Sequence, residues 1–234
     1  MKLLIAVTFA TTLAGCGSTT SSSDESPRLE LPVSCSVAAA PSAKLLVDDF
    51  EDGDTALDGH ANLHGNWYVN NDGTGTQVPP LAKSGATAAL LSEQGAPGSE
   101  SHSLYTSGTG FERWGAFVAT RLNSARSKAC SYDLSGSSGI QLEAKGSGNL
   151  RINLGSVETT PIVDGGDCTA EQCSDYGALV PLELDWTHIE LAFDELSQPE
   201  WATPSDWDAT QLLRVSFWSE QSDFEFWIDD VGFY

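Results

Sequence analysis

LLVDDFEDGD at residues 45–54 and FEFWIDDVGFY at residues 224–234 are the two most informative stretches of this sequence. Each is a short apolar strand pattern that runs into a pair of acids. In an antiparallel sandwich the first and last strands can lie side by side, and their acids would then converge. Clustered carboxylates repel one another unless water separates them or a cation neutralises them. The two stretches therefore predict a closed β-sandwich with a structural calcium.

Between these ends, apolar and polar residues alternate repeatedly with a period of two. The clearest runs are GIQLEAKG (139–146), NLRINLG (149–155), WTHIELAF (186–193) and LLRVSFW (212–218). Clusters of Gly, Asn, Asp and Ser separate the runs and supply turn chemistry. Short helical turns are expected near 194–198 and 208–213, but 45–234 shows no long helical stripe. Regularly spaced short strands without crossover helices are typical of an all-β sandwich or jelly roll.

The N-terminus has the form of an export signal, because Lys2 precedes an apolar run that is too short to span a membrane. LAGC at residues 13–16 resembles a bacterial lipobox, which implies removal of residues 1–15 and a lipid on the thiol of Cys16. Gly17 follows the cysteine, and by the same analogy the outer membrane or cell surface is favoured if the cell has two membranes. An ordinary signal peptide with a chance cysteine is the alternative.

Residues 16–44 are rich in Ser, Thr, Ala and Pro, so we expect the lipidated cysteine to begin a flexible tether. Residues 45–234 then form the folded domain. The chain carries 33 acids against 11 Lys and Arg, a formal charge of −22. Such a surface repels nucleic acid and anionic membrane, which leaves the lipid anchor as the only expected contact with a membrane. Acidity is also a general means of staying soluble.

Four cysteines remain after Cys16, and an exported protein is expected to form disulfides. Cys168 and Cys173 flank four residues, a spacing that can staple a loop. Cys35 and Cys130 would pair by elimination and pin the tether to the domain. A zinc site is the alternative for four cysteines, but the paired C-x-x-C spacing of such sites is missing.

Several motifs in the folded part follow one another in a familiar order. They are LLVDDFEDGD (45–54), GNWYVNNDGTGTQVPP (65–80), CSYDLSGSSGIQLEAKG (130–146), NLRINLG (149–155), CTAEQCSDYGALVPLELDWTHIELAFDEL (168–196) and LLRVSFWSEQSDFEFWIDDVGFY (212–234). This series resembles the galactose-binding-like jelly-roll domains of the carbohydrate-binding module family 11 and complex I intermediate-associated protein 30 type. The resemblance implies a domain that binds glycan and has no chemistry of its own. Cys130 stands where relatives often have Pro, and Tyr176 where they often have His, so the identity of the sugar is not carried over.

Sugar recognition combines aromatic faces, which cover the apolar face of a pyranose, with planar polar groups that bind its hydroxyls. The polar faces of the predicted strands carry both kinds of side chain. The candidate ligand-binding residues are Trp67, Tyr68, Arg151, Asn153, Tyr176, Arg214 and Trp218. Trp67 and Tyr68 are adjacent and point to opposite faces of a strand, so one of the two is expected in the core.

The acids of the two end strands are the candidate calcium ligands. Glu51 and one of Asp229 or Asp230 are the best side chains, with backbone carbonyls and water completing the shell. Relatives of the jelly roll often carry such an ion between an FE motif on the first strand and a DD motif on the last. The alternative is that these acids cap turns and accept hydrogen bonds from backbone N–H groups.

The sequence favours a binding protein over an enzyme. Its four histidines lack metal-protease or triad spacing, and G-x-S-x-G, H-E-x-x-H and phosphate-loop motifs are missing. We therefore expect non-catalytic binding of polysaccharide or glycan, which would hold polysaccharide near the cell or near partner hydrolases. A protein–protein adhesion or scaffolding module on the same fold is one alternative. A small glycan-active hydrolase or lyase is the other, because 33 acids always include a chance pair.

Overall fold

The computed structural model describes residues 38–99, 101–125, 128–169 and 171–234. The predicted signal peptide, the predicted lipidation site Cys16, and Cys35 lie outside these residues. Within the described ranges, no helix is long and apolar enough to cross a membrane.

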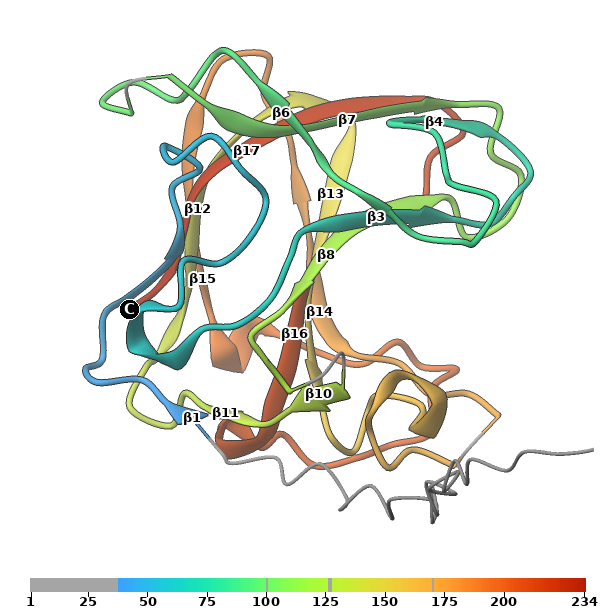
Figure 1. Ribbon diagram of the computed structural model, residues 1–234. Helices are drawn as coiled ribbons and strands as arrows, with labels where there is room; N and C mark the ends of the chain where they lie inside the picture. Colours follow the sequence, from blue (N-terminus) through green and yellow to red (C-terminus); the bar gives the residue numbers. More distant parts are fainter. Residues whose placement is uncertain (1–37, 100, 126–127, 170) are drawn as a thin grey trace, which may run out of the picture. The chain divides into compact units, whose positions relative to one another are not determined.

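The described chain is built from strands and loops, as the alternating sequence predicts (Figure 1). Its helical segments are short 3-10 turns: η1 (His60–Asn62), η2 (Ile162–Asp164), η3 (Phe193–Glu195) and η4 (Ala209–Gln211). Two of these, η3 and η4, fall where the sequence predicts helical turns. The all-β class is therefore confirmed.

The first sheet, called sheet 1 below, has eight strands. Six follow one another in the order β1 (Ala38–Ala39), β11 (Tyr132–Asp133), β16 (Leu212–Ser219), β8 (Ala116–Arg121), β3 (Tyr68–Asn71) and β5 (Thr87–Ala88). β13 (Asn149–Ser156) pairs with the edge of β16 opposite β8, and β14 (Tyr176–Pro181) pairs with β13. The two residues of β1 belong to the segment expected to be a tether, and they pair with β11 in parallel.

The second sheet, called sheet 2, has seven strands. Five follow the order β15 (Thr187–Ala192), β12 (Gly139–Ser147), β17 (Phe224–Phe233), β7 (Ser103–Thr109) and β4 (Thr76–Val78). Two more extend it, β2 (Leu45–Asp48) beside β17 and β6 (Leu90–Ser92) beside β7. A separate hairpin joins β9 (Asn123–Ala125) to β10 (Lys128–Cys130).

The first long strand and the last strand of the fold are neighbours. β2 pairs antiparallel with β17, with Asp48 opposite Val231 and Leu45 opposite Phe233. This is the arrangement that the two acidic end motifs predict. It joins β2 to sheet 2 through a pairing between residues from the two ends of the folded part.

One hydrophobic core lies between the sheets and takes residues from both. Val215 and Phe217 of β16 are fully buried, as are Ile140 and Leu142 of β12. The period of two explains the placement, because alternate residues of each strand point to the same face. Burial of these side chains contributes roughly 1.5–3 kcal/mol each to folding.

Trp67 also belongs to this core, and it therefore leaves the set of candidate ligand-binding residues. Its side chain is 0% exposed and stacks on Phe217, with ring centroids 5.7 Å apart. The indole Nε1 donates a hydrogen bond to Asp48 Oδ2 at 2.9 Å, which satisfies the one polar group of the ring. Of the adjacent pair, Trp67 is thus the inward residue, and Tyr68 faces outward from sheet 1.

Candidate functional site

The outer face of sheet 1 carries three parallel rows of side chains, because residues paired across neighbouring strands point to the same side. The first row runs Arg151, Trp218, Phe117, Asn70 across β13, β16, β8 and β3. The second runs Asn153, Ser216, Ala119, Tyr68 across the same strands. The third holds Gly155, Arg214 and Arg121. Along β8 and β16, the aromatic groups of Phe117 and Trp218 thus lie at one end of the face and the guanidinium groups of Arg121 and Arg214 at the other.

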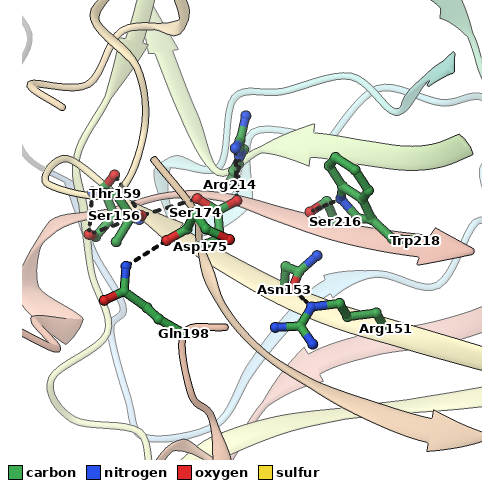
Figure 2. Close-up of polar contacts among 10 residues, drawn as sticks. All are labelled: Arg151, Asn153, Ser156, Thr159, Ser174, Asp175, Gln198, Arg214, Ser216 and Trp218. Atoms are coloured by element: carbon green, nitrogen blue, oxygen red, sulfur yellow. Dashed lines mark hydrogen bonds and ion pairs between the residues drawn. The ribbon is translucent and has the colours of Figure 1, made fainter. Parts of the chain in front are cut away.

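Four aromatic rings form a continuous cluster at the first row. Trp218 stacks on Phe117 with centroids 4.6 Å apart and an interplanar angle of 22°. Trp114 contacts Trp218 at 5.3 Å, and Tyr68 meets Phe117 edge-on at 6.0 Å. The indole Nε1 of Trp218 donates to Ser216 Oγ at 2.9 Å (Figure 2), which fixes the orientation of the ring. The cluster is rigid, and Trp114 at its edge is 39% exposed.

The members of these rows on β3, β8 and β16 line a cavity of about 950 Å³ on the outer face. Its centre is made of the small residues Ser216 and Ala119, which leave room between the aromatic row and the arginine row. Loops from three parts of the chain complete the wall. They contribute Thr55, Gly65, Asn66, Ser124, Pro161, Asp164 and Cys173. A volume of this size is typical of small-molecule and oligosaccharide-sized sites.

Arg214 is held in the cavity by a nearly buried carboxylate (Figure 2). Its Nε and Nη2 atoms donate to Asp175 Oδ2 at 2.9 and 2.8 Å. Thr159 Oγ1 donates to the other oxygen of Asp175 at 3.1 Å. Burial is the largest single influence and lowers the pKa of Arg214, but the charge and hydrogen bond of Asp175, together with the charges of Tyr68 and Asp164, outweigh it, so the pKa is raised. The guanidinium is therefore charged, fixed and oriented before any ligand arrives.

The disulfide loop supports this ion pair. The predicted bond between Cys168 and Cys173 is present, and Asp175 follows two residues later. Gln198 Nε2 donates to the carbonyl oxygen of Ser174 at 2.7 Å, which ties the same segment down from the other side. The pairing of Cys35 with Cys130 involves a residue outside the described ranges and stays a prediction.

The remaining candidate ligand-binding residues separate into two groups. Arg151 and Asn153 share the outer face, where Arg151 Nε donates to Asn153 Oδ1 at 3.0 Å, but neither lines the cavity (Figure 2). Tyr176 lies opposite Leu154 of β13, a core residue, so it points away from the outer face. It packs against Trp207 and donates through its hydroxyl to Ser205 O. The structure thus brings Tyr68, Arg214 and Trp218 together in the cavity.

Three cavity residues escaped the sequence analysis, namely Trp114, Phe117 and Arg121. The run AFVATR at 116–121 does not alternate apolar and polar residues, because Phe117 and Ala119 on the outer face are as apolar as Ala116 and Val118 on the inner face. The sequence therefore gives no clear signal that Phe117 and Arg121 face outward. Trp114 precedes the strand in a loop, and only the tertiary structure brings it to Trp218.

The outer face of sheet 2 carries a second aromatic row. Lys145, Trp227, Tyr105 and Leu90 are cross-strand neighbours on β12, β17, β7 and β6. Lys145 Nζ lies 4.8 Å from the ring centroid of Trp186 and 4.9 Å from that of Trp227. Tyr105 donates through its hydroxyl to Glu225 Oε1 at 2.8 Å. These residues contribute nothing to the lining of the 950 Å³ cavity.

The candidate calcium ligands lie at the edge formed by β2 and β17. Oε1 of Glu51 accepts hydrogen bonds from Ser99 Oγ and from the backbone N–H groups of Ser101 and His102. These donors lower the pKa of Glu51 to about 2. From the residues that the structure describes, its other oxygen accepts one hydrogen bond, from the hydroxyl of Ser101 at 3.2 Å.

Asp229 is fully buried, and its carboxylate accepts from the backbone N–H groups of Ala96 and Asp230. Burial nevertheless raises the pKa of Asp229 to about 6. The pKa of Asp230 is raised by burial and by the charges of Asp49 and other nearby acids. Among the described residues, no group of three or more His, Cys, Asp or Glu side chains is arranged to hold a metal. These contacts are those of the turn-capping alternative, and the calcium stays a prediction.

Comparison with known proteins finds no family model that matches the sequence and no match among curated proteins. Solved structures do match. A family 11 carbohydrate-binding module of a cellulosomal cellulase from Clostridium thermocellum has a TM-score of 0.51 and 13% identity, covering 83% of this chain and 95% of its own. A family 30 carbohydrate-binding module has a TM-score of 0.50 and 12% identity, covering 81% and 86%. At this identity the likeness shows the fold alone, an all-β jelly roll, as the sequence predicts.

Proposed function

We propose that this protein binds polysaccharide or another glycan, without acting on it, in the cavity on the outer face of sheet 1. The observation that carries the proposal is the fixed aromatic cluster of Trp218, Phe117 and Trp114 beside polar donors in one 950 Å³ cavity. Aromatic rings cover the apolar face of a pyranose, while arginine and tyrosine groups bind its hydroxyls. The fold is similar to those of a family 11 and a family 30 carbohydrate-binding module, which supports the proposal of glycan binding.

The cavity favours binding over hydrolysis. Among the described residues that line it, Asp164 is the only carboxylate. Hydrolysis of a glycosidic bond needs two carboxyl groups on either side of that bond. Asp175 does not serve as the second, because both its oxygens are engaged beneath the cavity by Arg214 and Thr159.

The proposal extends to the cellular setting. A lipid on Cys16 would anchor the domain to a membrane through the tether, on the outer membrane or cell surface in a cell with two membranes. The domain would then hold polysaccharide at the cell, or within reach of partner hydrolases. Mass spectrometry of the mature N-terminus tests the anchor, because a diacylglyceryl group on Cys16 is expected and an unmodified cysteine would contradict it.

Titration of the full chain with soluble β-glucan, xylan, galactan and uronate-containing polymers tests the binding itself. We expect at least one glycan to bind. Trp218→Ala should weaken that binding by about 30-fold or more, the effect of removing a central aromatic anchor. Trp227→Ala, the matched tryptophan on sheet 2, should change it less than about twofold. Absence of binding to every polymer, or equal losses in the two variants, would reject the site.

A further inference from the structure

Two arginines lie side by side in the cavity. Arg121 of β8 and Arg214 of β16 are direct cross-strand partners, and both line the cavity wall. Like charges placed directly opposite each other on a sheet are unfavourable unless something offsets their repulsion. The whole chain has only 11 Lys and Arg against 33 acids, so two of its few cations meet in one place.

The hydroxyl of Tyr68 lies near the same pair. Burial raises the pKa of Tyr68, the positive charges of Arg214 and Arg121 lower it, and the charges of Asp164 and Asp175 raise it, so both guanidiniums and these two carboxylates lie near the phenol. The described residues offer no hydrogen-bond partner to this hydroxyl, whereas the buried tyrosine Tyr132 donates to Ala61 O at 2.7 Å. Tyr68 therefore presents an O–H donor to the cavity beside two guanidinium groups.

Asp175 determines which edge of Arg214 is available. It accepts from Nε and Nη2, so the remaining nitrogen, Nη1, lies on the side of the guanidinium turned away from the carboxylate. Because Asp175 is itself fixed by Thr159, the arginine cannot swing to other partners without breaking a nearly buried pair. Arg214 is thus held ready for a ligand.

We infer that the arginine end of the cavity binds the carboxylate of an acidic sugar, a uronate residue of a polysaccharide, while the aromatic end stacks on a neighbouring sugar ring. The inference rests on the proposed glycan-binding function. Guanidinium groups bind carboxylates with planar, charge-assisted hydrogen bonds that are about twice as strong as neutral ones. A residue four positions along a strand lies about 13 Å away, so the distance from Arg214 to Trp218 spans more than one sugar unit.

The acidic surface of the protein does not oppose this assignment at physiological salt. The Debye length is then about 8 Å, so exposed acids farther away are largely screened, whereas a group in direct contact with the arginines is not. Asp164 is the one carboxylate among the described lining residues, and it lies exposed in the short turn η2. Its charge acts on the pKa of both Arg214 and Tyr68, but water screens an exposed carboxylate, so Asp164 offsets the charge of the arginines only in part.

A neutral sugar could also bind arginine through its hydroxyls, and a matched pair of polymers separates the two cases. We would titrate the full chain with polygalacturonate, alginate and glucuronoxylan, each against the same polymer with its carboxyls reduced to alcohols, at about 0.15 M ionic strength. At least one acidic polymer should bind about tenfold or more tightly than its reduced form, the worth of a charge-assisted hydrogen bond.

Arg121→Gln should remove most of that preference, and Arg121→Lys should keep part of it. Arg113→Gln is the matched control, because it removes one exposed positive charge outside the cavity, and it should change the preference less than twofold. Thermal unfolding checks that each variant is folded. If Arg121→Gln does not fold, the wild-type comparison of acidic and reduced polymers still decides.

Equal binding of every acidic polymer and its reduced form, or tighter binding of the reduced form, would overturn the uronate assignment while leaving glycan binding intact. A preference for the acidic form that survives Arg121→Gln would place the carboxylate elsewhere and overturn it too. Failure of all polymers, acidic and neutral, would reject the proposed function itself.

Discussion

The two sheets of this protein both present aromatic rows on their outer faces, yet only one row lines a cavity. On sheet 1, Trp218 and Phe117 lie beside small residues and open into about 950 Å³ of space. On sheet 2, Trp227 and Trp186 have Lys145 Nζ over their rings, within 5 Å of both centroids. In the first case the rings border open space, and in the second a lysine side chain of the protein covers them.

The difference teaches that an outward-facing tryptophan is not by itself a binding residue. Cross-strand aromatic pairs stabilise a sheet by their own contacts, and a lysine above them adds a cation–π interaction. What distinguishes sheet 1 is the neighbourhood of the rings, namely the small residues Ser216 and Ala119 beside them and the ordered donor Arg214 on the next row. The predictions below test this contrast.

The largest expected effect concerns the ion pair beneath the cavity. Asp175→Asn leaves the charge of Arg214 without its nearly buried partner, and breaking such a pair should lower the free energy of unfolding by about 3 kcal/mol. This loss is at the low end of the range for buried ion pairs, because the Arg214 side chain is 19% exposed. On sheet 2, Glu225→Gln removes an exposed charge while keeping an acceptor for Tyr105, and should cost less than about 0.5 kcal/mol.

Urea denaturation of the two variants provides the measurement. Comparable losses in Asp175→Asn and Glu225→Gln would mean that the ion pair contributes no more than a surface contact. Asp175 would then not hold Arg214 in place, and the argument that the cavity presents an oriented guanidinium would fail.

The fold could be predicted from the sequence because its signals are local and repeated. Alternation in 139–146, 149–155 and 212–218 places Ile140, Ile152 and Phe217 in the core, since the period of two is a property of the strand itself. The pairing of β2 with β17 followed from matching motifs at the two ends. That prediction needed only the rule that the first and last strands of an antiparallel sandwich can lie side by side, without any knowledge of side-chain contacts.

The site could be predicted only in part, because it depends on which strands become neighbours. Alternation put Arg214 and Trp218 on one outer face, but the sequence could not show that β8 would lie next to β16 and bring Phe117 and Arg121. The position of Tyr176 could not be predicted for a related reason, since the register of β14 against β13 turns its side chain toward the core. Trp114 comes from a loop, where no periodicity applies.

The second prediction compares two carboxylates that are nearly buried. Asp175 has a guanidinium partner, whereas Asp48 has only the N–H groups of Phe50 and Trp67, and burial raises its pKa to about 7. The folded state therefore holds a proton on Asp48 between about pH 4 and pH 7 that the unfolded state has lost. The stability from Asp48 is complete below its unfolded pKa and is lost progressively as pH rises to about 7, by at most roughly 1.4 kcal/mol for each pH unit between the two pKa values.

Asp48→Asn cannot titrate, so the difference in unfolding free energy between wild type and variant isolates this group from the other acids. Denaturant titrations between pH 4.5 and pH 8 should show the wild type losing stability relative to the variant as pH rises. A difference that stays constant across this range would mean that Asp48 remains ionised throughout.

The third prediction concerns calcium at the acidic edge of sheet 2, where Glu51 Oε2 and Asp230 are the side chains with capacity left for a cation. A bound ion stabilises the folded state by mass action, by about 1.4 kcal/mol when free calcium is ten times its dissociation constant. Calorimetry after chelation and then calcium addition should show the melting temperature rise, and Glu51→Gln should abolish the rise. An unchanged melting temperature would leave backbone capping as the only role of these acids.

The smallest expected effect tests the contrast between the two faces most directly. Lys145→Ala removes the ammonium from above Trp186 and Trp227, and should lower the free energy of unfolding by about 0.5–1 kcal/mol through the lost cation–π contacts. It also uncovers two indole faces without creating a cavity or ordered donors beside them. If the surroundings of a ring, rather than its exposure, make the site, the variant gains no glycan affinity, and its binding curves match those of the wild type. New glycan binding that is lost again in Lys145→Ala/Trp227→Ala would show that exposed tryptophan alone suffices for binding. The cavity and the ordered donors on sheet 1 would then not be what makes a glycan site.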